Sequence, residues 1–234
     1  MADAVSEFDA VAEDYEDQHA SSIRFSGEET GFFAEQKAAS VAEQLHRAGK
    51  PHPGTILDFG AGTGNSVGPL QSEFPESAIT CLDVSQRSLQ ICAERTGGSV
   101  ETMVFDGERI EAADKQFELV FTACVFHHIE HEHHIRLLRE LRRTLGSGGN
   151  MFLFEHNPWN PLTRLAVARC PFDENAVLIS APVMRQRFLS AGFSTATIQY
   201  GVFFPRFLAW LRPFEKYLGW LPMGAQYSIR ATVS

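Results

Sequence analysis

The sequence predicts a doubly wound α/β fold, in which a mostly parallel sheet is covered by helices on both faces. Short runs rich in β-branched and aromatic residues alternate with stretches of helical periodicity along most of the chain. Helices of this length between strands are typical of βαβ units and a parallel sheet. A chain of 234 residues, of which 44% are hydrophobic, can also fill the core of one such domain.

The elements are expected in a regular order. Two amphipathic helices precede the first strand, over residues 5–18 and 27–49. Seven strand candidates follow, over residues 54–59, 77–83, 99–106, 117–123, 150–155, 193–201 and 225–232. Helices are expected between them over residues 64–73, 85–96, 131–145 and 182–191. An aromatic segment over residues 205–219 is predicted to be a helix with a kink at Pro213.

Composition narrows the class of protein. The formal net charge of -9 disfavours nucleic acid as a partner, because that interaction relies on basic groups. The four cysteines lie far apart without a C-x-x-C pair, so neither a zinc site nor a disulfide framework is indicated. The acidic amino terminus lacks the basic and apolar regions of a secretory signal, and no uncharged apolar run is long enough to span a bilayer. We therefore expect a cytoplasmic protein with reduced thiols.

Residues 56–65, ILDFGAGTGN, join a buried strand to a glycine loop at its carboxyl end. In an open parallel sheet, ligands bind beyond this end of the strands. Gly60 permits a tight turn, Gly62 lets a ligand approach the backbone, and Gly64 lets the next helix pack closely. The dinucleotide pattern G-x-G-x-x-G fails, since Asn65 stands at its last position counted from Gly60, and no G-K-[ST] follows. The loop thus disfavours NAD.

Acidic residues end the next two strands. Asp83 lies 23 residues after Gly60, where a carboxylate can accept hydrogen bonds from both ribose hydroxyls. Asp106 lies where it can accept from the exocyclic amine of adenine. Either acid can instead cap the helix that follows it. The three strand ends in series favour an adenosine-like ligand.

The series LDFGAGTGN, LDVS, FDG, FELVFTACVFHHI and LRELRRTLGSGGNMFLFE resembles the class I S-adenosylmethionine-dependent methyltransferase family, from about residue 5 to beyond residue 156. The resemblance implies a Rossmann-like sheet of seven strands whose last strand, near 226–232, inserts antiparallel. It also implies a single methyltransferase domain over 1–234, made of a helical lid over 1–50, a cofactor-binding core over 51–156 and a substrate-side part over 157–234.

The resemblance further implies S-adenosylmethionine as the cofactor. Asp58 would face the ammonium group of its methionine part, which the glycine loop holds, while Asp83 and Asp106 would bind ribose and adenine. The segment FDAVAEDYE resembles the family's lid, in which Phe8 and Tyr15 cover the cofactor, although their spacing also suits a packed helix face. The full expected cofactor site is Phe8, Tyr15, Asp58, Gly60, Ala61, Gly62, Gly64, Asp83, Val84, Asp106 and Gly107.

Methyl transfer is an in-line displacement, so the protein mainly has to align the acceptor with the methyl group and exclude water. A base helps when the acceptor is a hydroxyl or a carbon. His127, nearest the end of the fourth strand, is a candidate base, with packing as the alternative. Glu155 and His156, at the end of the fifth strand, are expected to face the acceptor. The histidines of VFHHIEHEHH lack a completing ligand set, so no metal is expected.

Two later stretches bear on the acceptor. FEHNPWNPLTR resembles a bacterial small-molecule subset that carries E-H-N-P-x-N-P, and Asn157, Asn160 and Arg164 either face the acceptor or brace the turn. The aromatic segment is expected to be a hydrophobic lid, with a dimer contact or attachment to a membrane surface as alternatives.

The function expected from the sequence is methyl transfer to a small-molecule acceptor, with an apolar or amphiphilic one favoured, by a monomer or homodimer. Three alternatives stay open. They are a cyclisation or rearrangement on the same fold, a cofactor-responsive binding module without turnover, and an NAD-dependent oxidoreductase.

Overall fold

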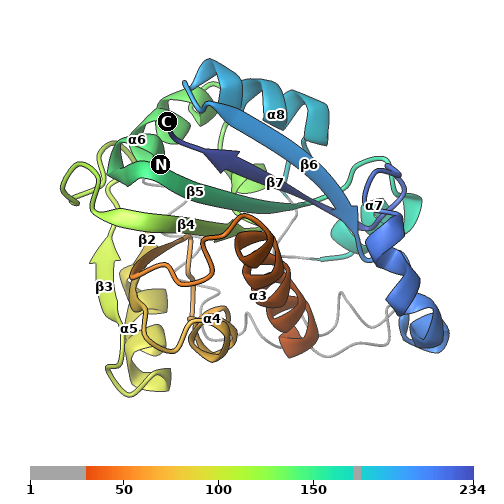
Figure 1. The fold of residues 1–234 in the computed structure, drawn as a ribbon, viewed down its shortest axis with the longest axis horizontal. Coiled ribbons are helices and arrows are strands. Elements are labelled where there is room, and N and C mark those ends of the chain that lie inside the picture. The colour runs from red at the N-terminus through yellow and green to blue at the C-terminus, as the bar shows by residue number, and fades with distance from the viewer. Residues whose placement is uncertain (1–29, 171–174) are drawn as a thin grey trace.

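The computed structural model describes residues 30–170 and 175–234. A seven-stranded sheet runs through it in the order β3-β2-β1-β4-β5-β7-β6 (Figure 1). Strands β1 to β5 pair in parallel, whereas β7 is antiparallel to both β5 and β6. The mostly parallel sheet with an antiparallel last strand is thereby confirmed. The strands are β1 Thr55–Phe59, β2 Ala78–Asp83, β3 Glu101–Val104, β4 Phe117–Ala123, β5 Leu145–His156, β6 Thr195–Gly201 and β7 Gln226–Thr232.

Helices cover both faces of the sheet, as predicted. In Figure 1, α3, α4 and α5 lie on one side of it, and α6 and α8 lie on the other. Two clusters of buried side chains match these layers, one shared with α3, α4 and α5 and one shared with α6 and α8. The helices are α3 Thr30–Arg47, α4 Val67–Glu73, α5 Gln86–Arg95, α6 His134–Thr144, α7 Pro161–Val167 and α8 Ala181–Ser190, with 3-10 segments η2 Phe126–His128 and η4 Arg206–Tyr217.

Helix α6 shows why these sequences fold into these layers. Leu137, Leu138 and Leu141 recur at helical spacing and are buried against the sheet, while the basic Arg142 and Arg143 stand in its last turn. Burying each leucine side chain contributes roughly 1.5–3 kcal/mol. The stripe of leucines therefore fixes which side of α6 meets the sheet.

Three segments differ from their prediction. Strand β5 begins at Leu145 and not near residue 150, because Gly146 to Gly149 continue the strand where the sequence suggests a loop. Helix α7 was not expected, although Asn160 caps it and Pro161 occupies its first turn. The aromatic segment forms the 3-10 element η4, with Pro213 inside it and non-helical geometry at Leu208.

The prediction that the aromatic segment over residues 205–219 is a hydrophobic lid is wrong in one respect. None of the residues of η4 is buried, so this segment does not bury an apolar face against the described part of the molecule.

The parallel strands bring their carboxyl ends to one edge of the sheet. Strand β1 ends at Phe59, β2 at Asp83, β4 at Ala123 and β5 at His156. Residues that follow these strands therefore lie along one edge of the sheet. Open α/β sheets bind ligands beyond this edge, and we call that position the crevice.

Candidate active site

The glycine loop after β1 has a backbone that only glycine adopts easily. Gly60 and Gly64 have φ angles of +75° and +83°, and a Cβ at either one would lie 2.3 Å from Val125 Cγ2 or 2.6 Å from Cys92 Sγ. Gly62 also has a positive φ, of +53°, but open space surrounds it. Gly60 and Gly64 thus serve packing, while Gly62 leaves room beside the backbone for a ligand.

Asp83 connects the end of β2 to this loop. Its Oδ2 accepts a hydrogen bond from the Gly62 amide at 2.8 Å, and its Oδ1 accepts one from the Ser85 amide at 2.9 Å. Each carboxylate oxygen can accept a further bond, because it has two lone pairs. The carboxylate therefore holds the loop against the end of β2. Val84, beside it, is half-buried.

Asp58 is a buried acid at the end of β1. Its side chain is 1% exposed, and among the residues that the structure describes its Oδ2 has no hydrogen-bond partner. Burial, followed by the proximity of Cys92 and Asp83, raises the pKa of this carboxyl from 3.8 to about 8. A buried acceptor without a donor is costly, so the site suits a ligand that brings a positive donor.

Asp106 is an exposed acid whose carboxylate accepts hydrogen bonds from the turn after β3. Its Oδ1 accepts from the amides of Glu108 at 2.7 Å and Arg109 at 3.0 Å, which lowers the pKa of this exposed carboxyl. No helix lies between β3 and β4, so Asp106 does not cap a helix, and its Oδ1 instead holds a turn. Gly107 is buried within that turn, with a φ of +88°. The predicted lid residues Phe8 and Tyr15 lie outside the described residues.

Glu155 and His127 form a buried pair behind the crevice. Glu155 Oε2 lies 2.6 Å from His127 Nδ1, and both side chains are at most 2% exposed. Glu155 Oε1 accepts from the amides of Val125 at 3.1 Å and Phe126 at 2.8 Å. Burial alone would raise the pKa of Glu155, but pairing with His127, with smaller effects of His156 and the Phe126 amide, lowers it. Both oxygens of Glu155 are therefore engaged by the chain itself.

His156 and Cys124 lie closer to the crevice. The His156 ring is 5.3 Å from that of His127, and His156 is near enough to Cys124 to affect the pKa of its thiol. Lys37, from α3, places Nζ 3.9 Å from Cys124 Sγ. Burial pushes the pKa of this thiol up, but the Lys37 ammonium and His156 outweigh it and lower the pKa to about 7.

Cys124 was missed by reasoning from sequence. It directly follows β4, as Asp83 ends β2, and the same position rule could have singled it out. Its φ of +59° is uncommon for a residue with a side chain, and such strain is concentrated at functional sites. Lys37 gave no signal, because it stands on a helix far away in sequence.

The E-H-N-P stretch mainly braces the chain. Asn157 donates to the carbonyls of Pro222 and Gly224, and Asn160 donates to that of Met223 while capping α7. These contacts tie the end of β5 to the segment before β7. Arg164 is exposed on α7.

One group of possible metal ligands occurs among the described residues, outside the crevice cluster. Glu130, Glu132 and His133 bring one ligand atom each within 4.8 Å of one another. His133 pairs with the two acids at 3.4 and 3.7 Å, and both acids are exposed. Ion pairing accounts for the proximity.

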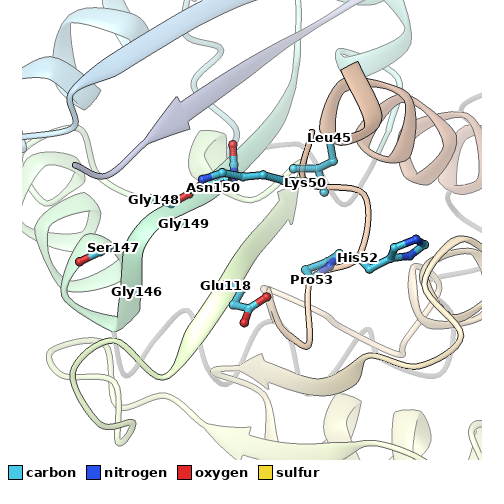
Figure 2. Close-up of a pocket in the computed structure, with 10 residues that line it drawn as sticks. All are labelled: Leu45, Lys50, His52, Pro53, Glu118, Gly146, Ser147, Gly148, Gly149 and Asn150. Carbon is cyan, nitrogen blue, oxygen red and sulfur yellow. Dashed lines mark hydrogen bonds between the residues drawn. The ribbon is translucent and has the colours of Figure 1, made fainter. Parts of the chain in front are cut away.

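A separate pocket opens at the opposite edge of the sheet. It encloses about 310 Å³ near the start of β1 and β4 and the first half of β5. Figure 2 shows Lys50 extending across it toward Gly148, whose carbonyl accepts from Nζ at 2.5 Å, while Glu118 lies on the other side. Because it lies at the amino ends of the strands, this pocket is not part of the crevice.

The known proteins to which this chain is similar in sequence are methyltransferases. A family described as "Methyltransferase domain" matches residues 56–149. Trans-aconitate 2-methyltransferase of Methylobacterium nodulans is 29% identical over 164 residues, which cover 68% of this chain and 60% of that protein. Ribosomal RNA small subunit methyltransferase C of Pseudomonas entomophila is 29% identical over 139 residues, which cover 56% of this chain and 41% of that protein. The chain thus spans less than two thirds of either relative.

The fold has close counterparts among solved structures. A methyltransferase of Thermotoga maritima, described as S-adenosylmethionine-dependent and as a possible histamine N-methyltransferase, superposes with a TM-score of 0.67. It is 18% identical, and the match covers 98% of this chain and 99% of that one, so the likeness concerns the fold. The family match over residues 56–149 includes the glycine loop, Asp83, Asp106 and the fourth strand, so this part of the chain is similar to a methyltransferase domain.

Proposed function

We propose that this protein transfers a methyl group from S-adenosylmethionine to a small-molecule acceptor. The observation that carries the proposal is the buried Asp58, whose Oδ2 lacks a partner within the described residues, beside a glycine loop that is open at Gly62. An ammonium group, as on the methionine part of the cofactor, supplies the missing donor and the opposite charge.

The remaining cofactor contacts follow from the same edge of the sheet. The carboxylate of Asp83 can accept hydrogen bonds from ribose hydroxyls, and the exposed carboxylate of Asp106 can accept one from an adenine amine. When bound, S-adenosylmethionine supplies an electrophilic methyl group on a sulfonium. The roles of Ala61, Val84 and Gly107 as backbone neighbours, and of Phe8 and Tyr15 as a cover, belong to this proposal.

The acceptor side is formed by His156, Cys124 and Lys37. These three side chains can hold or move a proton near the crevice, which an acceptor hydroxyl or amine needs. Glu155 acts as a positioning residue, because its carboxylate fixes the tautomer and orientation of His127. His127, at 2% exposure, supports His156 through ring contact and does not itself reach the acceptor.

Small acceptors suit the chain better than RNA. One relative is named for trans-aconitate and another for ribosomal RNA, so the names alone do not decide. The formal net charge of -9 disfavours binding to a phosphate backbone. We therefore propose that the acceptor is a small molecule, as for the bacterial methyltransferase subset that carries E-H-N-P-x-N-P. The four free cysteines suit the reducing cytoplasm.

Calorimetry with S-adenosylhomocysteine tests the cofactor assignment. Asp83→Ala should weaken binding by about 1–3 kcal/mol, since hydrogen bonds to a charged acceptor are lost. Glu94→Ala, an exposed acid on neighbouring α5, is the matched control and should bind normally. Stabilisation of the wild-type protein by NAD and not by S-adenosylhomocysteine in thermal shift would refute the assignment.

Mass spectrometry of products tests the reaction. Candidate acceptors incubated with S-adenosylmethionine should gain one methyl group as S-adenosylhomocysteine is released. An isomeric product without methyl gain would identify a rearrangement on this fold. Tight cofactor binding with no turnover of any acceptor class would favour a binding module.

A further inference from the structure

Large apolar side chains gather on one exposed face of the molecule. Among the described residues, twelve large hydrophobic side chains are exposed, and nine of them come from two segments, 159–165 and 207–223. We call this surface the aromatic face. Its members are Trp159, Leu162, Leu165, Phe207, Trp210, Phe214, Tyr217, Trp220 and Met223.

The two segments form one surface. Asn160 Nδ2 donates to the Met223 carbonyl at 2.8 Å, and the Trp159 ring stacks 6.5 Å from that of Tyr200. The amide of Tyr200 in turn donates to the Gly219 carbonyl at 2.8 Å. Helix α7 and η4 lie at the same end of the molecule in Figure 1. The exposed side chains are therefore neighbours on a continuous face.

Two polar side chains of η4, those of Glu215 and Arg212, are bound to other parts of the chain. Glu215 Oε1 accepts from the amides of Phe203 at 3.1 Å and Phe204 at 3.0 Å, so this acid turns toward the backbone just before η4. Arg212 donates to the Phe204 carbonyl and lies 4.5 Å over the Phe32 ring of α3. With Glu215 and Arg212 held by these contacts, η4 presents Phe207, at 77% exposure, and Trp210, at 71%, to the outside.

The charge of this face is opposite to that of the chain. Residues 157–170 and 202–224 contain five basic residues and a single acid, Glu215, whereas the whole chain has a net charge of -9. Arg164 and Lys216 are exposed among the apolar side chains. The face thus combines aromatic rings with basic groups.

We infer that the aromatic face docks on the surface of a bilayer that contains anionic phospholipids. Tryptophan and tyrosine rings suit the interface between headgroups and acyl chains, and neighbouring basic groups attract anionic headgroups. Exposed apolar side chains that gather on one face are also typical of interaction sites. No helix among the described residues is long and apolar enough to cross a membrane.

The position of the face bears on the acceptor, and this step rests on the proposed function. Asn157 follows β5 directly and is hydrogen-bonded to Gly224 beside the face. The face therefore borders the crevice that holds His156. A docked molecule takes an amphiphilic acceptor from the bilayer more readily than one dispersed in water.

Sedimentation with lipid vesicles tests the docking. The full chain should bind vesicles of phosphatidylcholine with phosphatidylglycerol, and replacement of Trp210 and Trp220 by serine should lower the vesicle-bound fraction about ten-fold or more. Val104→Ser with Val183→Ser, exposed apolar residues elsewhere, is the matched control and should bind like the wild type. The assay needs no methyl transfer, so its failure is distinct from failure of the proposed function.

Charge-reversal variants distinguish docking on anionic lipid from nonspecific hydrophobic adsorption. Arg164→Glu with Lys216→Glu should lower binding about ten-fold or more, whereas Lys115→Glu, at the opposite edge of the sheet, should not. Circular dichroism and the thermal midpoint should stay unchanged in all variants, because the replaced side chains are exposed.

Two outcomes would overturn the inference. One is equal sedimentation of wild type and tryptophan variants. The other is an absence of vesicle binding combined with a concentration-dependent dimer, seen by light scattering, that the tryptophan variants lose.

Discussion

Asp58 is a carboxylic acid placed where water does not reach it. In the folded chain its pKa is about 8, whereas an unfolded chain loses this proton near 3.8. The folded state therefore binds one more proton than the unfolded state between these values, and stability falls as pH rises through this window. A cationic ligand reverses the balance, because pairing favours the ionised form.

Binding of S-adenosylhomocysteine should accordingly strengthen with pH. Affinity should rise about ten-fold or more between pH 6 and pH 8, since binding at the lower pH has to displace the proton of Asp58. Calorimetry in buffers with different ionisation heats measures the affinity and the released proton together. Asp58→Asn should bind more weakly and lose this pH dependence, and an unchanged slope in that variant would separate Asp58 from the ammonium.

Cys124 should be the fastest thiol of the chain toward iodoacetamide at neutral pH. Its pKa of about 7 leaves much of it ionised, whereas Cys81 and Cys92 are fully buried. Lys37→Met should move the midpoint of the rate-pH profile upward by about one pH unit, because the ammonium that favours the thiolate is gone. Peptide mass spectrometry follows each cysteine, and Lys50→Met is the control. An identical profile in Lys37→Met would exclude the pairing.

At the scale of elements, the sequence predicted those whose apolar residues recur at a regular spacing or whose ends are marked by turn residues such as glycine. Strand β1 and its loop are marked by apolar residues followed by glycines, and α6 is marked by its leucine stripe. The start of β5 was not predictable from local preference, because Gly146 and Gly148 join the strand through long-range contacts such as that of the Gly148 amide with Val233. Pairings such as Lys37 with Cys124 depend on packing across the sheet edge.

The cap of α7 shows how a missed element is stabilised. Asn160 Oδ1 accepts from the amides of Leu162 at 2.9 Å and Thr163 at 3.0 Å. Asn160→Ala should lower the free energy of unfolding by about 1–2 kcal/mol, because the cap and the bond to Met223 are both lost. Asn160→Asp keeps the accepting oxygens and should fall between the two in urea denaturation. Equal stability of the alanine variant would show that the cap contributes nothing.

At the scale of the molecule, β7 completes the sheet. It pairs along its whole length with β5 on one side and β6 on the other, and Tyr227, Ile229 and Ala231 are buried. Without it, β6 loses its partner in the sheet, β5 keeps only β4, and both present unpaired backbone to solvent. The segment from Pro222 to Ala225 also anchors Asn157, so the strand couples the sheet to the edge of the crevice.

A chain that stops at Ala225 should therefore lose cooperative folding, as opposed to being merely less stable. Ile229→Ala is the graded comparison, since it removes buried methyl groups but keeps the strand, and should cost about 2–5 kcal/mol while unfolding in one transition. Near-ultraviolet circular dichroism during urea unfolding distinguishes the two. A sharp, native-like transition in the shortened chain would mean that β1 to β5 fold as an independent unit and that β7 is added to a finished core.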